Sequence, residues 1–232
     1  MQKLANMLRR SDRRSLEKVM EMPVLTDEQR AASDREAKEA ARRERVRVAR
    51  QRIASAHIPP LYASASLGDC HPAVAEYASE VAEGGTGWLL LTGRNGRGKT
   101  HQACAALRHL AKTHRVEFAT MQGILDECKQ TFGRPESEED VKSHYRNVPV
   151  LVLDDLGKEN PTDYSLPIIF DIVDRRYTRL KPTIITTNMN AAQLLAHMST
   201  KGDRTMAESV VSRLGTARVV EITGPDRRLR NA

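Results

Sequence analysis

Apolar residues follow two patterns along most of the chain. Short apolar runs predict buried strands at residues 88–91, 116–120, 148–153, 183–187 and 218–222. Between them, apolar residues recur at helical spacing and predict helices at 73–82, 100–111, 123–132, 138–145, 166–180, 191–198 and 206–214. Strands that alternate with helices are typical of a parallel sheet covered by helices on both faces. The pattern therefore predicts an α/β fold for most of the chain.

The beginning of the chain carries helical patterns without strands. A first helix is predicted by apolar residues at helical spacing: Leu4, Met7, Leu8, Leu16, Val19 and Met20. Thr26 and Gln29 form a capping box, which predicts the start of a second helix. That helix continues to about Ser55 through residues rich in Ala, Glu and Arg, and the pair Pro59-Pro60 ends it. Because its apolar residues are mostly alanines, this helix has little surface to bury by itself.

Most of the net charge lies in the first quarter of the chain. Residues 1–58 hold 15 Lys and Arg against 9 Asp and Glu, whereas residues 59–232 hold 22 against 21, within a net charge of +7. We therefore expect a basic helical arm at 1–58 and a nearly neutral domain at 59–232. The basic block at 42–47 fits a solvated charged helix, a helix that binds a protein partner, or a contact with nucleic acid.

Composition excludes several classes of protein. No apolar run among the 232 residues approaches the roughly 18 residues of a membrane span, and residues 1–6 have no apolar signal-peptide core. Cys70, Cys104 and Cys128 stand far apart, so they form neither a disulfide framework nor a cysteine-rich zinc site. We expect a globular cytoplasmic protein without a membrane partner.

One glycine-rich segment has the spacing of a phosphate-binding loop. It matches G-x-x-x-x-G-K-[ST] between a predicted strand and a predicted helix, with these residues: Gly93, Arg94, Asn95, Gly96, Arg97, Gly98, Lys99 and Thr100. Glycines let backbone N–H groups turn inward around an anion, and the positive end of the following helix adds to the site. Lys99 would reach the β and γ phosphates, and the Thr100 hydroxyl would be a ligand for Mg²⁺. The segment thus predicts a nucleotide site, with ATP and Mg²⁺ as the expected ligands.

Three residues of this region have two interpretations each. Arg94 and Arg97 are bulky for variable loop positions, so they either face solvent or add charge near the nucleotide. His101 follows the loop threonine and either packs near the nucleotide or only begins the helix.

Two carboxylates follow the predicted strand at 148–153. Asp154 at the carboxyl end of the strand would hold the Mg²⁺ shell, and Asp155 could orient and deprotonate the attacking water. Alone, two adjacent acids in a turn are often only a helix cap. Together with a phosphate-binding loop on a neighbouring strand, they predict a hydrolytic pair.

Further polar residues help to distinguish between classes of nucleotide-binding proteins. Asn188 follows the strand at 183–187 and could help to position water beside the γ-phosphate, although an asparagine also commonly starts a helix. Arg213 on a short helix, and Arg228 near the C-terminus, are candidates to stabilise transition-state charge, one of them across a subunit interface.

The segments GRNGRGKTH, VLVLDDLGKE, DRRYTRLKPTIITTN, VVSRLG and GPDRRLR, in this order, resemble the AAA+ ATPases of the DnaC-type helicase loaders and the related IstB transposition helpers. The resemblance covers residue 57 to the end. It implies that Gly93–Thr100 bind phosphates, that Asp154 and Asp155 are the Walker B pair, and that Asn188 is sensor 1. It also implies that Arg213 is a trans arginine finger and Arg228 is sensor 2.

The same resemblance carries expectations about architecture. It implies an AAA+ fold with a parallel sheet flanked by helices, a helical insertion at 123–145, and a truncated or absent lid because the chain ends soon after Arg228. In the family the insertion lines a helical assembly and touches single-stranded DNA, so Lys129, Lys142 and Arg146 are candidates for that contact. Asp155 departs from the glutamate that most AAA+ proteins carry, which predicts weak hydrolysis.

We weighed several functions on these grounds. The first is an ATP-dependent loader whose arm binds a hexameric replicative helicase and whose ATPase domains assemble and deliver it to single-stranded DNA. The second is an IstB-like helper that assembles on duplex DNA and directs a transposase. The others are an adaptor that binds ATP without hydrolysing it and a small-molecule kinase, which Asn188 and Arg213 disfavour. Since the insertion offers its own route to DNA, we favour partner binding by the arm.

Overall fold

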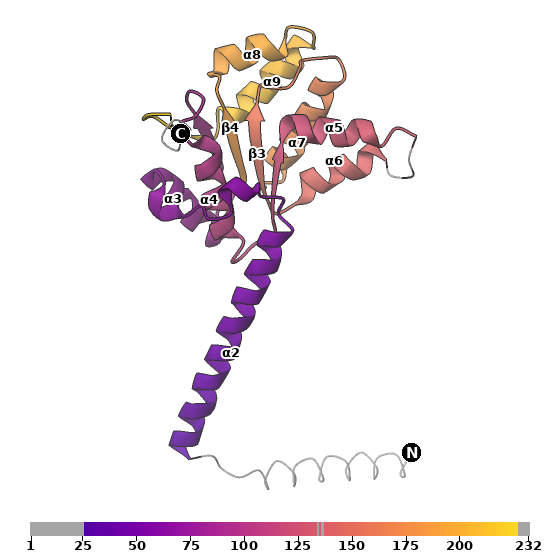
Figure 1. Cartoon of the computed structure of the whole chain (residues 1–232). Helices are drawn as coiled ribbons and strands as arrows, with labels where there is room; N and C mark the ends of the chain where they lie inside the picture. Colours follow the sequence, from indigo (N-terminus) through magenta and orange to yellow (C-terminus); the bar gives the residue numbers. More distant parts are fainter. Residues whose placement is uncertain (1–25, 134, 136, 227–232) are drawn as a thin grey trace, which may run out of the picture. The chain divides into compact units, whose positions relative to one another are not determined.

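The computed structural model describes residues 26–133, 135 and 137–226 (Figure 1). The helix predicted around residues 4–20 and the residue Arg228 lie outside these described residues. Within them, no helix combines the length and the apolar character that a bilayer span requires.

Five parallel strands form one sheet in the order β2-β3-β4-β1-β5. Their bounds are Trp88–Thr92 (β1), Val116–Thr120 (β2), Val150–Leu156 (β3), Thr183–Thr187 (β4) and Arg218–Glu221 (β5). Each predicted strand is present. The largest difference is β3, which begins after Pro149 and continues through both acids, with an irregular register between Leu153 and Leu156.

The helices that connect the strands also follow the prediction. Their bounds are Pro72–Ala82 (α3), Lys99–Leu110 (α4), Met121–Gln130 (α5), Glu138–Asn147 (α6), Ser165–Thr178 (α7), Ala191–Met198 (α8) and Arg204–Leu214 (α9). Side-chain caps explain several starts: Ser137 and Asn190 form capping boxes, and Thr120 accepts a hydrogen bond from the backbone N–H of Gly123.

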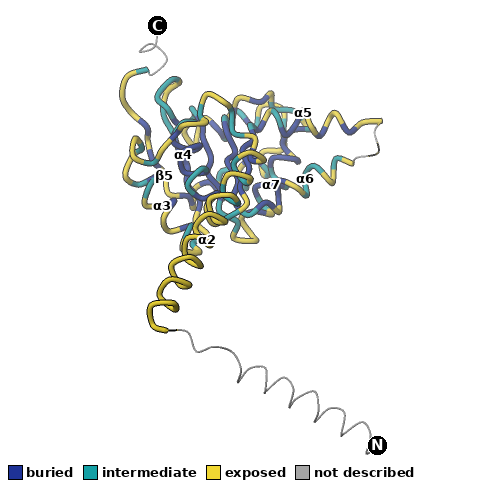
Figure 2. The backbone as a smooth tube through the Cα atoms, turned by 60° about the horizontal axis from the view of Figure 1, so that its bottom comes forward, coloured by how far each residue is buried: buried dark blue, intermediate teal, exposed yellow. Residues whose placement is uncertain are grey.

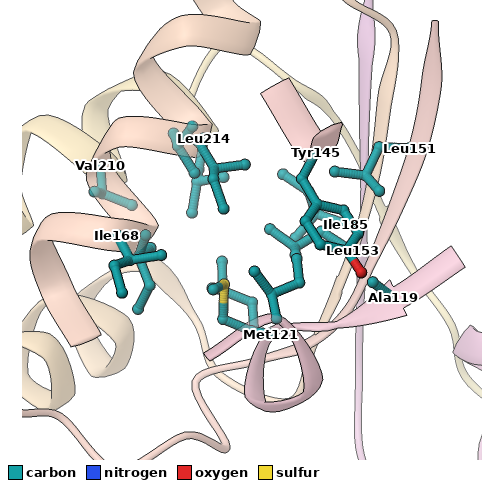
Figure 3. Close-up of a cluster of buried hydrophobic side chains, with 14 of the residues drawn as sticks. Ala119, Met121, Tyr145, Leu151, Leu153, Ile168, Ile185, Val210 and Leu214 are labelled. Carbon is teal, nitrogen blue, oxygen red and sulfur yellow. The ribbon is translucent and has the colours of Figure 1, made fainter. Parts of the chain in front are cut away.

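The sheet is buried on both faces (Figure 1). In β1, Leu89 and Leu91 pack with α3 and α4, whereas Trp88 and Leu90 pack with the helices α5 to α9. Figure 3 shows the hydrophobic core on the side of the sheet that faces α5 to α9, where Leu214 of α9 lies near residues of the central strands. Because successive residues of a strand point to opposite faces, a strand covered on both sides must have apolar residues on both, as β1 has from Trp88 to Leu91.

Helix α2 (Asp27–Ala54) contrasts with this arrangement because none of its residues is buried (Figure 2). The contacts within the chain divide it into two compact units between Arg45 and Val46. The second of these units begins at Val46, and the domain boundary expected at residue 59 stays a prediction. Within this unit, Arg52 near the end of α2 donates to the carbonyl of Ala111, and Ala56, just after the helix, is fully buried.

Arg176 connects several elements from the inside of the second unit. This side chain of α7 is 1% exposed, and its N–H groups donate to the Thr183 hydroxyl and to the carbonyls of Tyr145, Val148 and Pro182. Burial lowers the pKa of Arg176 to about 9. The guanidinium thus satisfies the carbonyls of Tyr145 and Val148 at the end of α6, and adds a second donor to the carbonyl of Pro182, which also accepts from the N–H of Leu151.

Glu117 in β2 connects two further segments of the second unit. Its buried carboxylate contacts Nδ1 of His57 at 2.5 Å, just after α2, and Nε2 of His144 in α6 at 3.4 Å. Burial alone would raise the pKa of Glu117, but the hydrogen bonds from the two histidines together outweigh it and leave the pKa below its ordinary value. The same contact raises the pKa of His144.

Candidate nucleotide-binding site

The glycine-rich segment forms the loop between β1 and α4, and its backbone has little space around it. Gly93, Gly96 and Gly98 have φ angles of 128°, 75° and 95°, which disfavour side chains. A Cβ atom on Gly93 would lie 2.5 Å from the carbonyl oxygen of Ile222, and one on Gly96 would lie 2.0 Å from a carboxylate oxygen of Asp226. The segment after β5 therefore packs directly against the loop.

Lys99 points back into the loop rather than out to solvent. It is 6% exposed, and its Nζ donates to the carbonyls of Gly93 at 2.8 Å and Arg94 at 3.1 Å. Nζ also lies 2.5 Å from Oδ1 of Asn188, which follows β4. The fold thus brings together a lysine and an amide that are far apart in the sequence, at the carboxyl edge of neighbouring strands.

Asp154 is the most buried acid of the site, at 3% exposed. Its carboxylate accepts hydrogen bonds from the hydroxyl of Thr100 at 3.0 Å and the hydroxyl of Thr186 at 2.6 Å. Burial raises the pKa of Asp154, the charge of Asp155 adds to the increase, and the two hydroxyl groups oppose it. Thr100 and Asp154 therefore meet as the sequence predicts.

Asp155 has an uncommon backbone conformation, with a φ of 58°. Its N–H group donates to the Thr186 hydroxyl at 2.9 Å, so one threonine contacts both acids. Its carboxylate pairs with Nζ of Lys158 at 2.7 Å. Neither Thr186 nor Lys158 could be singled out from the sequence, because neither belongs to a spacing motif. Only their position beside the two acids in the folded chain identifies them as part of the site.

A pocket of about 430 Å³ contains these groups. It is lined by nine of the predicted site residues: Asn95, Gly96, Gly98, Lys99, Thr100, His101, Asp154, Asp155 and Asn188. It is also lined by residues that the sequence did not indicate, which are Pro59, Leu61, Tyr62, Phe118, Thr120 and Lys158. The rings of Tyr62 and His101 meet edge to face at 6.4 Å between centroids. The lining therefore includes apolar and aromatic side chains as well as lysines and acids.

Other candidate residues lie outside this pocket. Arg94 is exposed and lines a second, mostly apolar pocket of about 480 Å³ that Gly93 and Asn188 also line. Arg97 is partly exposed and lines neither pocket. Arg213 in α9 pairs with Asp174 in α7. The structure thus brings together the loop, the acids and Asn188, and keeps Arg213 apart from them.

The candidates for DNA contact in α5 and α6 are engaged in local contacts. Lys142 lies 2.8 Å from a carboxylate oxygen of Glu138, and Arg146 pairs with Glu139 and Asp171. Nζ of Lys129 lies 5.9 Å from the centroid of the Tyr164 ring. Each of these basic groups has an intramolecular partner in the described part of the chain.

The donor chemistry of the site fits Mg²⁺ bound together with a nucleotide. The Thr100 hydroxyl and the Asp154 carboxylate are hard oxygen ligands, which Mg²⁺ prefers, and they already converge on one point. Lys99 supplies the positive charge that phosphate oxygens need, next to the N-terminus of α4. The residues present therefore suit both groups.

This sheet and this site define a P-loop NTPase domain of the AAA+ class. Within that class, the chain belongs to the family of IstB-like ATP binding proteins, whose sequence model matches residues 10–232. The predicted AAA+ fold and the predicted resemblance are both confirmed.

The chain is also similar to replication proteins. It is 32% identical over 121 residues to the replicative helicase loader DnaC of Escherichia coli K12, which covers 51% of this chain and 49% of that protein. A crystal structure of the DnaC helicase loader matches with a TM-score of 0.60 and 27% identity, over 71% of this chain and all of that one. A crystal structure of DnaI matches with a TM-score of 0.62 and 25% identity, over 72% and 95% of the two chains. In sequence, the chain spans about half the length of the curated relatives it matches.

Proposed function

We propose that this protein is an ATP-dependent helicase loader, in which the arm binds a hexameric replicative helicase and the AAA+ domain helps to deliver it to single-stranded DNA. The observation that carries the proposal is the similarity to the DnaC helicase loader structure, at 27% identity over the whole of that chain. The proposal keeps the expectation of a cytoplasmic protein.

ATP binding is the best supported step of the mechanism. The inward N–H groups of the glycine loop and the N-terminus of α4 attract the phosphates. Lys99 would exchange its contacts with the neutral carbonyls of Gly93 and Arg94 for contacts with phosphate oxygens, which is favourable because these acceptors are charged. Its neighbour Asn188 would then face the γ-phosphate.

Hydrolysis would use the acid pair. Thr100 and Asp154 would hold Mg²⁺, which neutralises charge on the phosphates when bound. Asp155 would orient and accept a proton from the attacking water, and for this its carboxylate must leave the ion pair with Lys158. The side chain of Asp155 is shorter than that of a glutamate, and it is paired with Lys158. Both features predict slow turnover.

Assembly would complete the site. Arg213 is absent from the residues that line the pocket of its own chain, which supports a role at the pocket of a second copy in an ATP-dependent homo-oligomer. Arg228 remains the proposed sensor 2, acting in its own chain. The helices α5 and α6 remain the proposed contact with single-stranded DNA, through Lys129, Lys142 and Arg146.

The proposal is tested by delivery of the helicase to DNA. The helicase is mixed with circular single-stranded DNA that carries an annealed strand, and the displacement of that strand is measured with and without this protein. We expect displacement to increase with wild-type protein and ATP, and not with the Lys99→Ala variant. Equal displacement with and without the protein would contradict the proposal.

A second function is favoured by the family match itself, because its description is IstB-like. In that case the protein would assemble on duplex DNA and direct a transposase. ATP-dependent filaments on duplex DNA, seen by electron microscopy, together with no binding of helicase, would support this alternative.

A further inference from the structure

Helix α7 carries a slot on the side that packs against α9. The slot consists of Phe170, Asp174 and Tyr177, which lie on one helical face because they are spaced by four and three residues. Arg213 occupies it. Its guanidinium pairs with the Asp174 carboxylate, and the guanidinium carbon lies 5.4 Å from the Phe170 ring centroid and 5.7 Å from that of Tyr177.

The walls of the slot are themselves fixed by the core. The Tyr177 ring meets the ring of Trp88 edge to face at 6.0 Å, and Trp88 is 6% exposed. The indole N–H of Trp88 donates to the carbonyl of Lys181 at 2.9 Å. On the other side, Nη1 of Arg213 donates to the carbonyl of Ser209 at 2.8 Å. The guanidinium is therefore held in one place before any partner arrives.

Stability alone does not account for an arginine here. The side chains of Arg213 and Asp174 are only 24% and 26% exposed, so the cost of removing both charges from water offsets much of the attraction between them. In the described part of the chain, the buried Nε of Arg213 has no hydrogen-bond acceptor, which is a cost that an apolar side chain between the two rings would avoid. An arginine that is rigid, cationic and still partly exposed suits recognition of an anion.

We propose that Asp174 is a positioning residue, which with the rings of Phe170 and Tyr177 holds Arg213 ready for the γ-phosphate in the pocket of a second copy of this chain. This inference rests on the proposed trans role of Arg213. Asp174 and the carbonyl of Ser209 each accept from one N–H group of the guanidinium and fix its direction, and the remaining N–H groups of Nη1 and Nη2 are available to phosphate oxygens. Because the arginine is held in advance, assembly does not have to order it, and its contact is made when charge develops on the phosphate.

The test uses mixtures of variants, since a trans residue acts on the neighbouring site. We expect Asp174→Asn to lower kcat for ATP by about tenfold with an unchanged KM, as a weakened arginine finger would. Its own pocket is intact, so adding Asp155→Asn chains, which lack the catalytic acid and keep Arg213, should restore turnover. A mixture of Asp174→Asn with Arg213→Ala should stay low, because neither chain presents the arginine well. Glu208→Gln is the matched control, since it removes the partner of Arg204 on α9 and leaves the slot alone.

The outcomes separate this inference from the function on which it rests. Full turnover by Arg213→Ala alone would overturn the proposed trans role. Loss of activity in Arg213→Ala that Asp155→Asn chains rescue, with wild-type turnover in Asp174→Asn, would overturn only the inference about Asp174. Increased turnover in Asp174→Asn would also overturn it, because Asp174 would then restrain Arg213. If Asp174→Asn has a low turnover that Asp155→Asn chains do not restore, the substitution has damaged the structure. The Asp174→Glu variant keeps the charge and should recover turnover if the inference holds.

Discussion

The two compact units of the chain use their charged residues in different ways. In α2 before Arg45 the charges are exposed, as in the pair Arg43–Glu39, whose side chains are 84% and 70% exposed. In the unit that begins at Val46, Lys99, Asp154 and Arg176 are each less than 10% exposed and lie among specific partners. Charges of the first kind contribute little to folding and are available to a partner. Charges of the second kind decide both the fold and the chemistry.

The largest effect is expected at Lys99. Lys99→Ala removes the cation of the phosphate loop, so ATP turnover should fall by roughly 10²–10³-fold, as for the loss of one preorganised electrostatic contact. Turnover is measured by phosphate release at saturating ATP. Lys112→Ala, on an exposed turn after α4, is the control and should turn over normally. Normal turnover by Lys99→Ala would show that the pocket is not the ATP site.

The next effect is on stability and concerns Arg176. Arg176→Met fills similar space but removes the Arg176 donors of the carbonyls of Tyr145 and Val148, so the free energy of unfolding should fall by about 3 kcal/mol. Urea denaturation followed by circular dichroism measures it. Arg175→Met, on the same helix with a side chain that is 53% exposed, should change stability by less than about 0.5 kcal/mol. Similar losses in both variants would refute the distinction between buried and exposed charges.

A smaller change of opposite sign is expected at Asp154. Its pKa is raised in the fold, so the folded chain favours the protonated acid, and the stability this contributes is lost as the pH rises through that pKa. Asp154→Asn resembles the protonated form. Without nucleotide at pH 7, it should therefore be more stable than wild type, while its ATP turnover falls.

The difference in stability between Asp154→Asn and wild type should shrink as the pH is lowered. Urea titrations at several pH values measure this trend. A variant that is less stable than wild type at pH 7 would mean that the hydroxyl groups of Thr100 and Thr186 outweigh burial.

The smallest effect on folding is expected in the arm. Replacing Arg42, Arg43 and Arg45 by Gln should change the free energy of unfolding by less than about 0.5 kcal/mol, because none of them is buried. The same variant should bind the helicase more weakly, which an affinity measurement would detect. A large loss of stability would show that these arginines serve the fold rather than a partner.

The sequence predicted the parts of the molecule that depend on local pattern. The strands and helices, the glycine loop and the two acids follow from periodicity and spacing, and the structure places Lys99, Thr100, Asp154 and Asn188 in one pocket as expected. The order of the strands did not follow, because pairing between β1, β4 and β5 joins segments that are distant in the sequence.

The contacts of individual side chains also could not be predicted from the sequence. Thr186 and Lys158 contact the two acids only because the fold places them nearby. Arg176 likewise reaches its carbonyl partners only after α6, β3 and β4 have packed together. Ala56, just after α2, is fully buried in the second unit, although the alanine-rich sequence around it predicts no such packing.

The most direct test of the loader compares the full chain with residues 46–232, a cut that keeps the buried Ala56 and the contacts of Arg52. Both proteins are assayed for ATP turnover and for binding to the replicative helicase in solution. We predict that the shorter chain turns over ATP like the full chain but no longer binds the helicase. Equal binding of the helicase by both chains would contradict the claim that the arm carries the partner.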